Sequence, residues 1–319
     1  MQIVIRHDTK HALGGDVTLV LVVDARRAVE TVFQRIWQKV FQFERQFSRF
    51  LPDSELSQFN RNAGLHLSIS EDFAALLAAS QALSQATDGL YNPFVLPAIQ
   101  RAGYLDSAVG RYTTAASDDF RDRAVVSADH LQLETDRHAT IPYGTALDMG
   151  GCGKGYLADA IANELDQAGL QGYWVSLSGD MVTCGFDELG KPWKTAIVSA
   201  RTPQAESLSY VTGYGERLHI ATSGTFPRPG QVKLQGHHLI DPRTGQAAKT
   251  DIKLVTVVAT SAMAADVLAS CAVITGSQQA IPFLKTKAAL GACIQTAKRD
   301  YSYGTNVMTS PLRKAAYAS

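Results

Sequence analysis

Hydrophobic and polar residues follow one another along the chain in patterns that predict both strands and helices. Residues 14–24 alternate and then run apolar, as in a strand. Residues 26–48 carry apolar side chains three or four positions apart, a spacing that is typical of one face of a long amphipathic helix. The next segment, residues 48–68, is polar and rich in turn-forming residues, so we expect it to connect two elements.

A second helix is predicted over residues 71–86. Ser70 stands directly before it, and a serine at this position caps a helix by accepting a hydrogen bond from the first turn. Residues 87–89, Thr-Asp-Gly, then interrupt the helical pattern. Residues 103–147 contain short runs that favour strands separated by turns.

The second half of the chain repeats this mixture of elements. A glycine-rich loop at residues 148–155 leads into a helix predicted over 156–168, and Gly169 suits the position after the helix end. The further predictions are strands at 172–177, 194–199 and 253–260, a loop rich in Gly, Pro, Thr and His at 217–245, and helices at 263–275 and 278–290. Strands mixed with long helices, without strict alternation, indicate the α+β class.

Composition and charge exclude several functional classes. Lys+Arg and Asp+Glu both number 30 and the isoelectric point is near 7.1, which argues against a general nucleic-acid binder and against a polybasic membrane anchor. The longest apolar run near the N-terminus, residues 17–23, is far shorter than the ~20 residues that span a bilayer, and no signal peptide is visible. The four cysteines form no CxxC pair, which favours reduced thiols and a cytoplasmic location.

The glycine-rich loop, Asp148 to Gly155, is the first candidate for chemistry. Four glycines that open a helix let main-chain N–H groups approach an anion closely, and Lys154 adds a positive charge. The spacing matches neither the P-loop nor GxGxxG. A tight turn that packs a helix on a sheet explains the glycines equally well.

A second candidate lies in the predicted helix 263–275. Asp266 and Ser270 are four residues apart, so both oxygens lie on one helix face. A carboxylate and a hydroxyl together suit a hard cation such as Mg²⁺. The alternative is that Asp266 only interacts favourably with the dipole at the start of the helix.

Two polar segments remain. His237 and His238 are adjacent and point apart, so a single histidine that acts as acid, base or hydrogen-bond donor fits better than a zinc site. Residues 221–224, Ala-Thr-Ser-Gly, are predicted as a polar turn after a short apolar strand, and as a motif they are nonspecific alone. Residues 178–180, Ser-Gly-Asp, do not match the nucleophile elbow of hydrolases.

The order and the residue sequences of these segments resemble those of one family, the FAD:protein FMN transferases or ApbE family. The matching segments are Leu13-Gly14-Gly15, residues 47–60 (FSRFLPDSELSQFN), residues 87–93 (TDGLYNP), the glycine-rich loop with Lys154, and residues 178–180, 221–224, 238–245 (HLIDPRTG) and 265–270 (ADVLAS). Together they extend over roughly residues 12–295.

The resemblance implies an α+β, T-fold-related single domain over residues 1–296, followed by a surface tail at 297–319. It implies Mg²⁺-dependent transfer of the FMN half of FAD to a Thr or Ser hydroxyl of an acceptor flavoprotein, with release of AMP. FAD contacts are implied at Leu13, Phe50, Leu90, Tyr91, Asn92, Asp148, Lys154 and Ile240. Metal ligands are implied at the Gly151 carbonyl, Asp266 and Ser270. His238 matches the histidine proposed to assist the attacking hydroxyl, and Lys154 would neutralise charge in the transition state.

This chain departs from the usual family pattern at several of these positions, namely Leu13 for Met, Asn92 for Asp, Cys152 for an aliphatic residue, Ser178 for Gly, and Ser270 for Thr. Ser270 keeps a hydroxyl, whereas Asn92 lacks the charge. Two alternatives stay open: a Mg²⁺-dependent FAD pyrophosphatase that uses the same site without a protein acceptor, and a flavin-binding carrier without catalysis. Many relatives are exported lipoproteins, but no lipobox is present here, so a cytoplasmic enzyme is expected.

Overall fold

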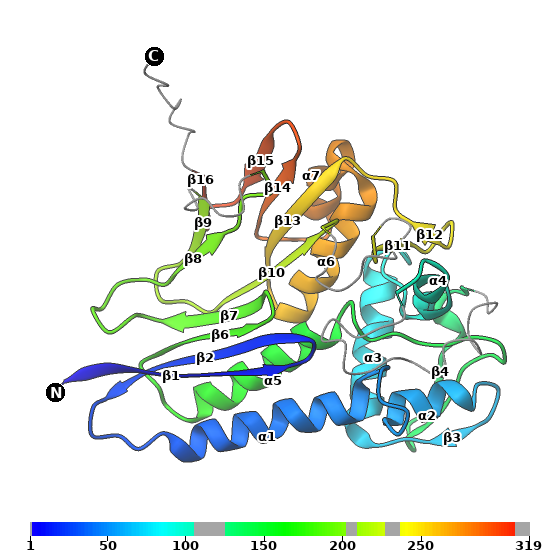
Figure 1. Cartoon of the computed structure of the whole chain (residues 1–319), viewed down its shortest axis with the longest axis horizontal. Helices are drawn as coiled ribbons and strands as arrows, with labels where there is room; N and C mark the ends of the chain where they lie inside the picture. Colours follow the sequence, from blue (N-terminus) through cyan, green and yellow to red (C-terminus); the bar gives the residue numbers. More distant parts are fainter. Residues whose placement is uncertain (1, 105–124, 202–208, 227–236, 310–319) are drawn as a thin grey trace.

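An antiparallel sheet of eight strands runs through the protein (Figure 1). The computed structural model describes residues 2–104, 125–201, 209–226 and 237–309. In spatial order the strands are β1 (Ile3–Ala12), β2 (Gly15–Asp24), β6 (Gly172–Leu177), β7 (Asp180–Gly185), β10 (Leu218–Gly224), β13 (Ile252–Ala259), β14 (Gly291–Thr296) and β15 (Asp300–Tyr303).

Two pairs of helices cover this sheet. Helices α1 (Glu30–Phe47) and α5 (Gly153–Gln167) pack on β2 and β6, where their apolar faces enclose one hydrophobic core. Helices α6 (Ala262–Thr275) and α7 (Ser277–Thr286) pack on β10, β13 and β14 and enclose a second core. Figure 1 shows α5 and α6 meeting near the middle of the molecule. This junction places the glycine-rich loop before α5 next to the start of α6.

Strand β13 is apolar almost throughout because it is covered on both faces. Val255 and Val257 face α6, while Val258 packs with residues of a small sheet on the other side. The small sheet consists of β8 (Lys194–Ile197), β9 (Ser209–Thr212) and β16 (Val307–Thr309) in the order β16-β9-β8. A strand covered on both faces loses the alternation of apolar and polar residues.

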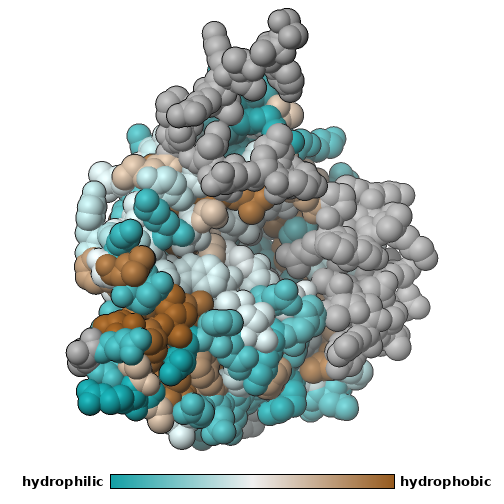
Figure 2. Space-filling view, turned by 60° about the vertical axis from the view of Figure 1, so that its left-hand side comes forward, coloured by the Kyte–Doolittle hydropathy of each residue, from teal (hydrophilic) through white to brown (hydrophobic). Residues whose placement is uncertain are grey.

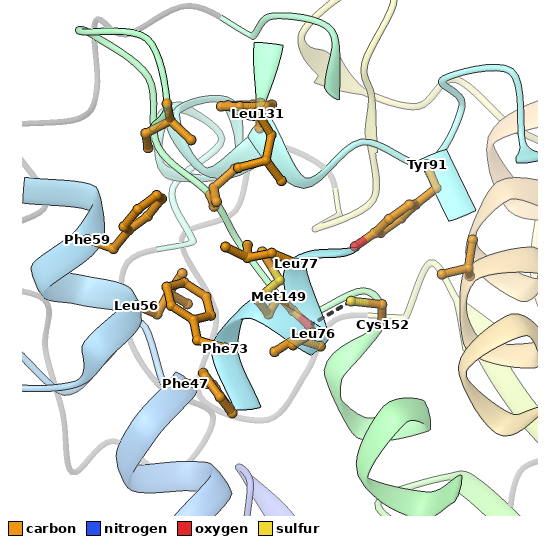
Figure 3. Packing of buried hydrophobic residues seen from close by; sticks show 14 of the residues in the cluster. Phe47, Leu56, Phe59, Phe73, Leu76, Leu77, Tyr91, Leu131, Met149 and Cys152 are labelled. Carbon is orange, nitrogen blue, oxygen red and sulfur yellow. Dashed lines mark hydrogen bonds between the residues drawn. The ribbon is translucent and has the colours of Figure 1, made fainter. Parts of the chain in front are cut away.

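A helical layer lies beside the sheet and contributes one wall of the site. It contains α2 (Glu55–Arg61), α3 (Glu71–Ala86), α4 (Leu96–Arg101), the 3₁₀ helices η1 (Pro93–Val95) and η3 (Ala128–His130), and the strands β3 (Leu67–Ser68), β4 (Gln132–Leu133) and β5 (His138–Thr140). Phe73, Leu76 and Leu77 of α3 are fully buried and form the centre of a third core (Figure 3). A two-stranded sheet, β11 (Ile240–Asp241) and β12 (Gln246–Ala247), follows near α4.

Most predicted elements are confirmed, and so is the α+β class. The strands predicted at 14–24, 172–177, 194–199 and 253–260 correspond to β2, β6, β8 and β13. Helix α3 has the predicted bounds, and the Ser70 hydroxyl accepts a hydrogen bond from the Phe73 N–H at 3.2 Å. Gly169 follows α5 with φ +63°, the left-handed conformation expected after a helix end.

Several boundaries are corrected. The helix predicted at 26–48 begins at Glu30, the helix at 156–168 begins at Gly153, and the helix at 278–290 ends at Thr286. The segment 48–68 contains α2, and the loop predicted at 217–245 contains β10 and β11. Residues 227–236 of that loop, and residues 105–124 of the segment 103–147, lie outside the described residues.

The prediction of an irregular tail at residues 297–319 is wrong for residues 300–309. Strand β15 pairs with β14 and extends the main sheet, and β16 pairs with β9. Residues 310–319 lie outside the described part of the chain. The main sheet therefore ends on a strand that belongs to the segment predicted as a tail.

The surface carries both hydrophilic and hydrophobic residues (Figure 2). Among the coloured residues of Figure 2, whose view brings the left-hand side of Figure 1 forward, hydrophilic ones predominate, and a compact hydrophobic patch lies at the lower left. Among the described residues, no helix combines the length and the apolar character that crossing a membrane requires.

Candidate functional site

Two hairpin turns form one rim of the site. The β1–β2 turn, Leu13-Gly14, and the β6–β7 turn, Ser178-Gly179, have positive φ at all four residues, as type I′ turns require. The turns lie side by side, since a Cβ on Gly15 would come within 2.4 Å of the Ser178 Oγ. A leucine and a serine in left-handed conformations are uncommon, and here the two tight hairpin turns require them.

The glycine-rich loop forms the floor, and its glycines have different functions. A Cβ on Gly155 would lie 2.4 Å from the Ala262 carbonyl oxygen, so Gly155 permits the close crossing of α5 and α6. A Cβ on Gly151 would only touch the Tyr91 ring, at 3.5 Å. The N–H of Gly153 donates to the Met149 carbonyl at 2.7 Å, so this N–H closes the turn instead of facing an anion. Tight packing thus explains part of the glycine pattern.

The start of α6 is anchored by α5. The Asp159 carboxylate accepts hydrogen bonds from the N–H groups of Ala262 at 2.8 Å and Met263 at 3.0 Å. The Ser261 hydroxyl caps the same turn by accepting from the Ala264 N–H at 3.0 Å. These bonds satisfy the free donors at a helix start. They also fix α6 relative to the helix that carries Lys154.

Asp266 and Ser270 of α6 face the cavity one turn apart. Asp266 is 4% exposed, and its Oδ2 is buried without a hydrogen-bond partner among the described residues. The Ser270 and Ser223 hydroxyls are 2.9 Å apart in a hydrogen bond, which ties α6 to β10. A buried carboxylate oxygen without such a partner is costly unless a cation neutralises it.

Lys154 lies between two buried carboxylates. Its ammonium forms an ion pair with Asp180, the first residue of β7, and lies 3.8 Å from the Asp266 Oδ2. Asp180 is 2% exposed and is not among the cavity-lining residues, so it contacts Lys154 on the side away from the cavity. Two largely buried carboxylates, of which only Asp266 faces the cavity, therefore lie next to one ammonium.

A buried arginine forms part of the opposite wall. Arg49 Nε lies 3.3 Å from the Asp148 Oδ1, and the guanidinium carbon lies 4.1 Å from the centroid of the Phe50 ring and 4.7 Å from that of Tyr104. The rings of Tyr104 and His238 have centroids 6.0 Å apart. Cation–π contacts of this kind hold a guanidinium flat against a ring.

Tyr91 and Cys152 belong to the hydrophobic core of the helical layer (Figure 3), and Tyr91 also lines the cavity. The Tyr91 hydroxyl is 2.8 Å from the Ser80 hydroxyl, and burial raises the pKa of Tyr91 well above its usual range. Burial also raises the pKa of the Cys152 thiol to about 12. A thiol with this pKa is protonated at neutral pH and is not a nucleophile.

Asn92 uses its amide to shape the turn before η1. Its Oδ1 accepts from the Phe94 N–H at 2.9 Å, and its Nδ2 donates to the Val126 carbonyl at 2.8 Å. An uncharged amide suits this position because it must both accept and donate. The side chain that replaces the family's usual Asp is thus engaged in local structure as well as lining the cavity.

The two adjacent histidines differ in their surroundings. The Leu239 N–H donates to His237 Nδ1 at 3.3 Å, so His237 is neutral and its Nε2–H donates to the Ala248 carbonyl at 2.9 Å. Burial lowers the pKa of His237. His237 is not among the residues that line the cavity, whereas His238 is. This arrangement separates a structural histidine from one that faces the site.

All these walls enclose one cavity of about 620 Å³, a volume usual for a small-molecule site. Every site residue predicted from the sequence lines it: Leu13, Phe50, Leu90, Tyr91, Asn92, Asp148, Gly151, Lys154, His238, Ile240, Asp266 and Ser270. The structure adds Arg49, Tyr104 and Ser223 to the lining. Arg49 lies in the matching segment 47–60 but was not among the predicted site residues, and Tyr104 lies in none of the motifs. Ser223 lies in the Ala-Thr-Ser-Gly segment, which is nonspecific alone.

The donor set fits a hard cation better than zinc. Within the described ranges, no three His, Cys, Asp or Glu side chains are grouped to hold a metal. The cavity instead offers the Asp266 carboxylate, the Ser270 hydroxyl and the backbone at Gly151, which are oxygen donors of the kind that Mg²⁺ prefers. The buried Asp266 Oδ2 gives this fit its physical basis.

Comparison with known proteins relates the chain to flavin transferases. It is 29% identical over 244 residues to the FAD:protein FMN transferase of Haemophilus influenzae (73% of this chain, 69% of the relative) and 26% identical over 273 residues to that of Escherichia coli K12 (81% and 74%). Its fold matches the flavinyl transferase ApbE of Pseudomonas stutzeri with a TM-score of 0.78 at 22% identity, over 95% of both chains. The flavin transferase ApbE of Vibrio cholerae matches with a TM-score of 0.77 at 22% identity, over 95% and 98%. The model of the ApbE family matches residues 13–294, and the chain therefore belongs to the ApbE family.

Proposed function

We propose that this protein transfers the FMN moiety of FAD to a Thr or Ser hydroxyl of an acceptor flavoprotein. The acceptor oxygen forms a bond to the FMN phosphorus, the pyrophosphate P–O bond breaks, and AMP leaves. The observation that carries the proposal is the convergence of all predicted site residues on one cavity, with the Asp266 carboxylate buried beside Lys154. The names of the relatives support the same activity.

Charge neutralisation is the main chemical task, because phosphoryl transfer depends on positioning and electrostatic stabilisation. Asp266, Ser270 and the Gly151 carbonyl would hold Mg²⁺, which when bound would polarise phosphate oxygens. The Lys154 ammonium lies close enough to Asp266 to add a second positive charge at the same phosphate group. Both charges act in a partly buried site, where electrostatic interactions are stronger than in water.

The apolar and aromatic lining would bind the rings of FAD. Leu13, Phe50, Leu90, Tyr91 and Ile240 line the same cavity as the charged groups. Aromatic faces favour offset stacking with flat heterocycles. The Asp148 carboxylate, held by Arg49, supplies a fixed hydrogen-bond acceptor on this wall.

His238 is the proposed base for the acceptor hydroxyl. It lines the cavity and packs against the Tyr104 ring, which restricts its orientation. Removal of the hydroxyl proton by a histidine makes the oxygen a better nucleophile. If water occupied the place of the acceptor hydroxyl, the same groups would hydrolyse FAD to FMN and AMP.

The test is an incubation of the protein with FAD, Mg²⁺ and candidate acceptor flavoproteins. Mass spectrometry of the acceptor measures covalent FMN, and chromatography measures AMP. FMN on one Thr or Ser, with AMP in equal amount, is the expected result. AMP without a protein adduct across several good acceptors would indicate hydrolysis, and FAD that stays intact would indicate a carrier.

The cellular setting is part of the same proposal. A cytoplasmic enzyme that modifies a cytoplasmic flavoprotein agrees with the sequence expectations. Cell fractionation followed by detection of covalent flavin in each fraction tests this location. Covalent flavin confined to exported proteins would contradict it.

A further inference from the structure

Lys154 and Asp180 form a buried ion pair, and the proposed reaction gives Asp180 no function. Asp180 is 2% exposed and is not among the cavity-lining residues, yet it forms the closer of the two ion pairs that Lys154 makes within the described residues. A charged residue buried this deeply is costly unless its partner is well placed. A buried carboxylate outside the cavity can still affect the site through the lysine that it contacts.

The positions of the three charged groups are fixed by different elements. Asp180 follows the β6–β7 turn and pairs in register with Leu177, which holds its backbone rigidly. Lys154 lies in the first turn of α5, and Asp266 lies in α6. Close crossing of α5 and α6 at Gly155 brings the long Lys154 side chain within reach of both carboxylates. The ammonium can therefore satisfy Asp180 or Asp266.

The charges of Lys154, Asp180 and Asp266 do not balance. Two buried carboxylates and one ammonium leave one negative charge uncompensated by this trio. In the structure Lys154 bonds to Asp180 and stays 3.8 Å from the Asp266 Oδ2, which has no hydrogen-bond partner among the described residues. Among the described residues, the carboxylate that pairs less closely with Lys154 is thus Asp266, the one that faces the cavity.

We propose that Asp180 is a positioning residue that draws the Lys154 ammonium away from Asp266 and so keeps Asp266 available for a divalent cation. The inference rests on the metal site of the proposed function and deepens it. Without Asp180, Lys154 turns to Asp266 and competes with the cation for the same oxygen. Asp180 therefore sets the cation affinity of the site without touching the cation.

The test measures cation binding instead of turnover. Mn²⁺ is titrated into the full-length protein, without and with FAD, and free Mn²⁺ is followed by electron paramagnetic resonance. The variants are Asp180→Asn, Lys154→Gln and the double variant. Asp166→Asn is the matched control, because Asp166 forms an ion pair with Arg217 at the other end of α5.

Asp180→Asn is expected to weaken Mn²⁺ binding about tenfold or more, because the ammonium then neutralises Asp266. Lys154→Gln is expected to bind Mn²⁺ at least as tightly as the wild type, and the double variant to return to within a few-fold of it. The Asp166→Asn control is expected to bind as the wild type does.

Four outcomes overturn the inference. Wild-type affinity in Asp180→Asn would show that Asp180 is only structural. A double variant as weak as Asp180→Asn would show that Asp180 does not act through Lys154. If Asp180→Asn does not fold, Lys154→Gln alone decides, and weaker Mn²⁺ binding in it overturns the proposal. A wild-type protein that binds no Mn²⁺ in either condition would overturn the proposed metal site as well, which distinguishes the two failures.

Discussion

Arg49 Nε lies 3.3 Å from the Asp148 Oδ1, and the two side chains are only 5% and 11% exposed. They come from the segment after α1 and from the start of the glycine-rich loop, which are about 100 residues apart in sequence. The Arg49 guanidinium also stacks on Phe50 and Tyr104. One cation thus joins the loop to the aromatic wall of the cavity.

Replacing Arg49 should destabilise the protein and weaken FAD binding. Arg49→Gln leaves the Asp148 carboxylate buried without its ion pair, and breaking a buried pair typically costs about 3–5 kcal/mol. The free energy of unfolding from urea titration measures the loss. The double variant with Asp148→Asn should recover part of the stability, because no unpaired charge is then left. Additive losses in the double variant would show that the two residues do not act together.

Cys152 should be dispensable for catalysis. Burial raises the pKa of its thiol to about 12, so the thiol is protonated at neutral pH, and its Sγ lies 3.8 Å from the Met149 carbonyl oxygen. Cys152→Ala should keep the rate of FAD turnover within a few-fold and lower stability slightly. Loss of all turnover with an unchanged circular dichroism spectrum would show that the thiol takes part in the reaction.

The elements that could be predicted from the sequence are those whose pattern is local. Helix α3 combines a capping Ser70 with regular apolar spacing, and β13 is a run of β-branched residues. Only a short apolar strand before residue 221 is predicted from the sequence, because Ala-Thr-Ser-Gly at 221–224 indicates a polar turn, whereas β10 continues to Gly224. Its place between β7 and β13 depends on pairing with strands that are distant in sequence, and such pairing has no local signal.

The same distinction applies to the site. Asp266 and Ser270 could be predicted because a four-residue spacing places them on one helix face. Asp180 belongs to the Ser-Gly-Asp segment, but its partner Lys154 lies 26 residues earlier and on another element. Arg49 is a single charge beside Phe50, and only the fold brings it to Asp148. Partners that meet through tertiary contacts cannot be predicted from spacing alone.

His237 should make stability depend on pH in a defined range. Burial lowers its pKa below the ordinary value of 6.5, so the unfolded chain binds the proton more readily than the folded one. Its stabilising contribution is therefore complete above about pH 6.5 and decreases as the pH falls below that value. Urea unfolding at pH 7.5 and 5.5 should show a smaller difference for His237→Gln than for the wild type. The exposed His7, changed to Gln, is the control, and an equal effect of both variants would contradict the assignment.

His238 should affect transfer far more than binding. General base assistance is typically worth about 10²–10⁴-fold in rate, so His238→Ala should slow FMN transfer by that factor. FAD affinity, measured by flavin fluorescence, should change little because the other lining residues remain. A large loss of FAD affinity with unchanged transfer at saturation would show that His238 binds FAD instead of assisting the hydroxyl.

Asp266 should be essential for metal-dependent turnover although it is not needed for folding. Metal ions contribute several kcal/mol to charge stabilisation, so Asp266→Ala or Asp266→Asn should lower Mg²⁺-dependent turnover by about 10³-fold or more. Ser270→Ala should be milder, since water can replace a neutral ligand, and Ser270→Thr should be tolerated. Turnover against Mg²⁺ concentration, measured for each variant, ranks the two ligands.

Stability provides an independent test of Asp266. Its buried Oδ2 lacks a hydrogen-bond partner among the described residues, so Asp266→Ala removes an unfavourable charge, and metal-free stability should not fall below that of the wild type. With Mg²⁺ at 100 times its dissociation constant, the wild type should gain about 2.7 kcal/mol of stability, whereas Asp266→Ala should gain none. A variant that is stabilised by Mg²⁺ to the same extent as the wild type would place the metal elsewhere. Asp266 would then be a charge that interacts only with the start of α6.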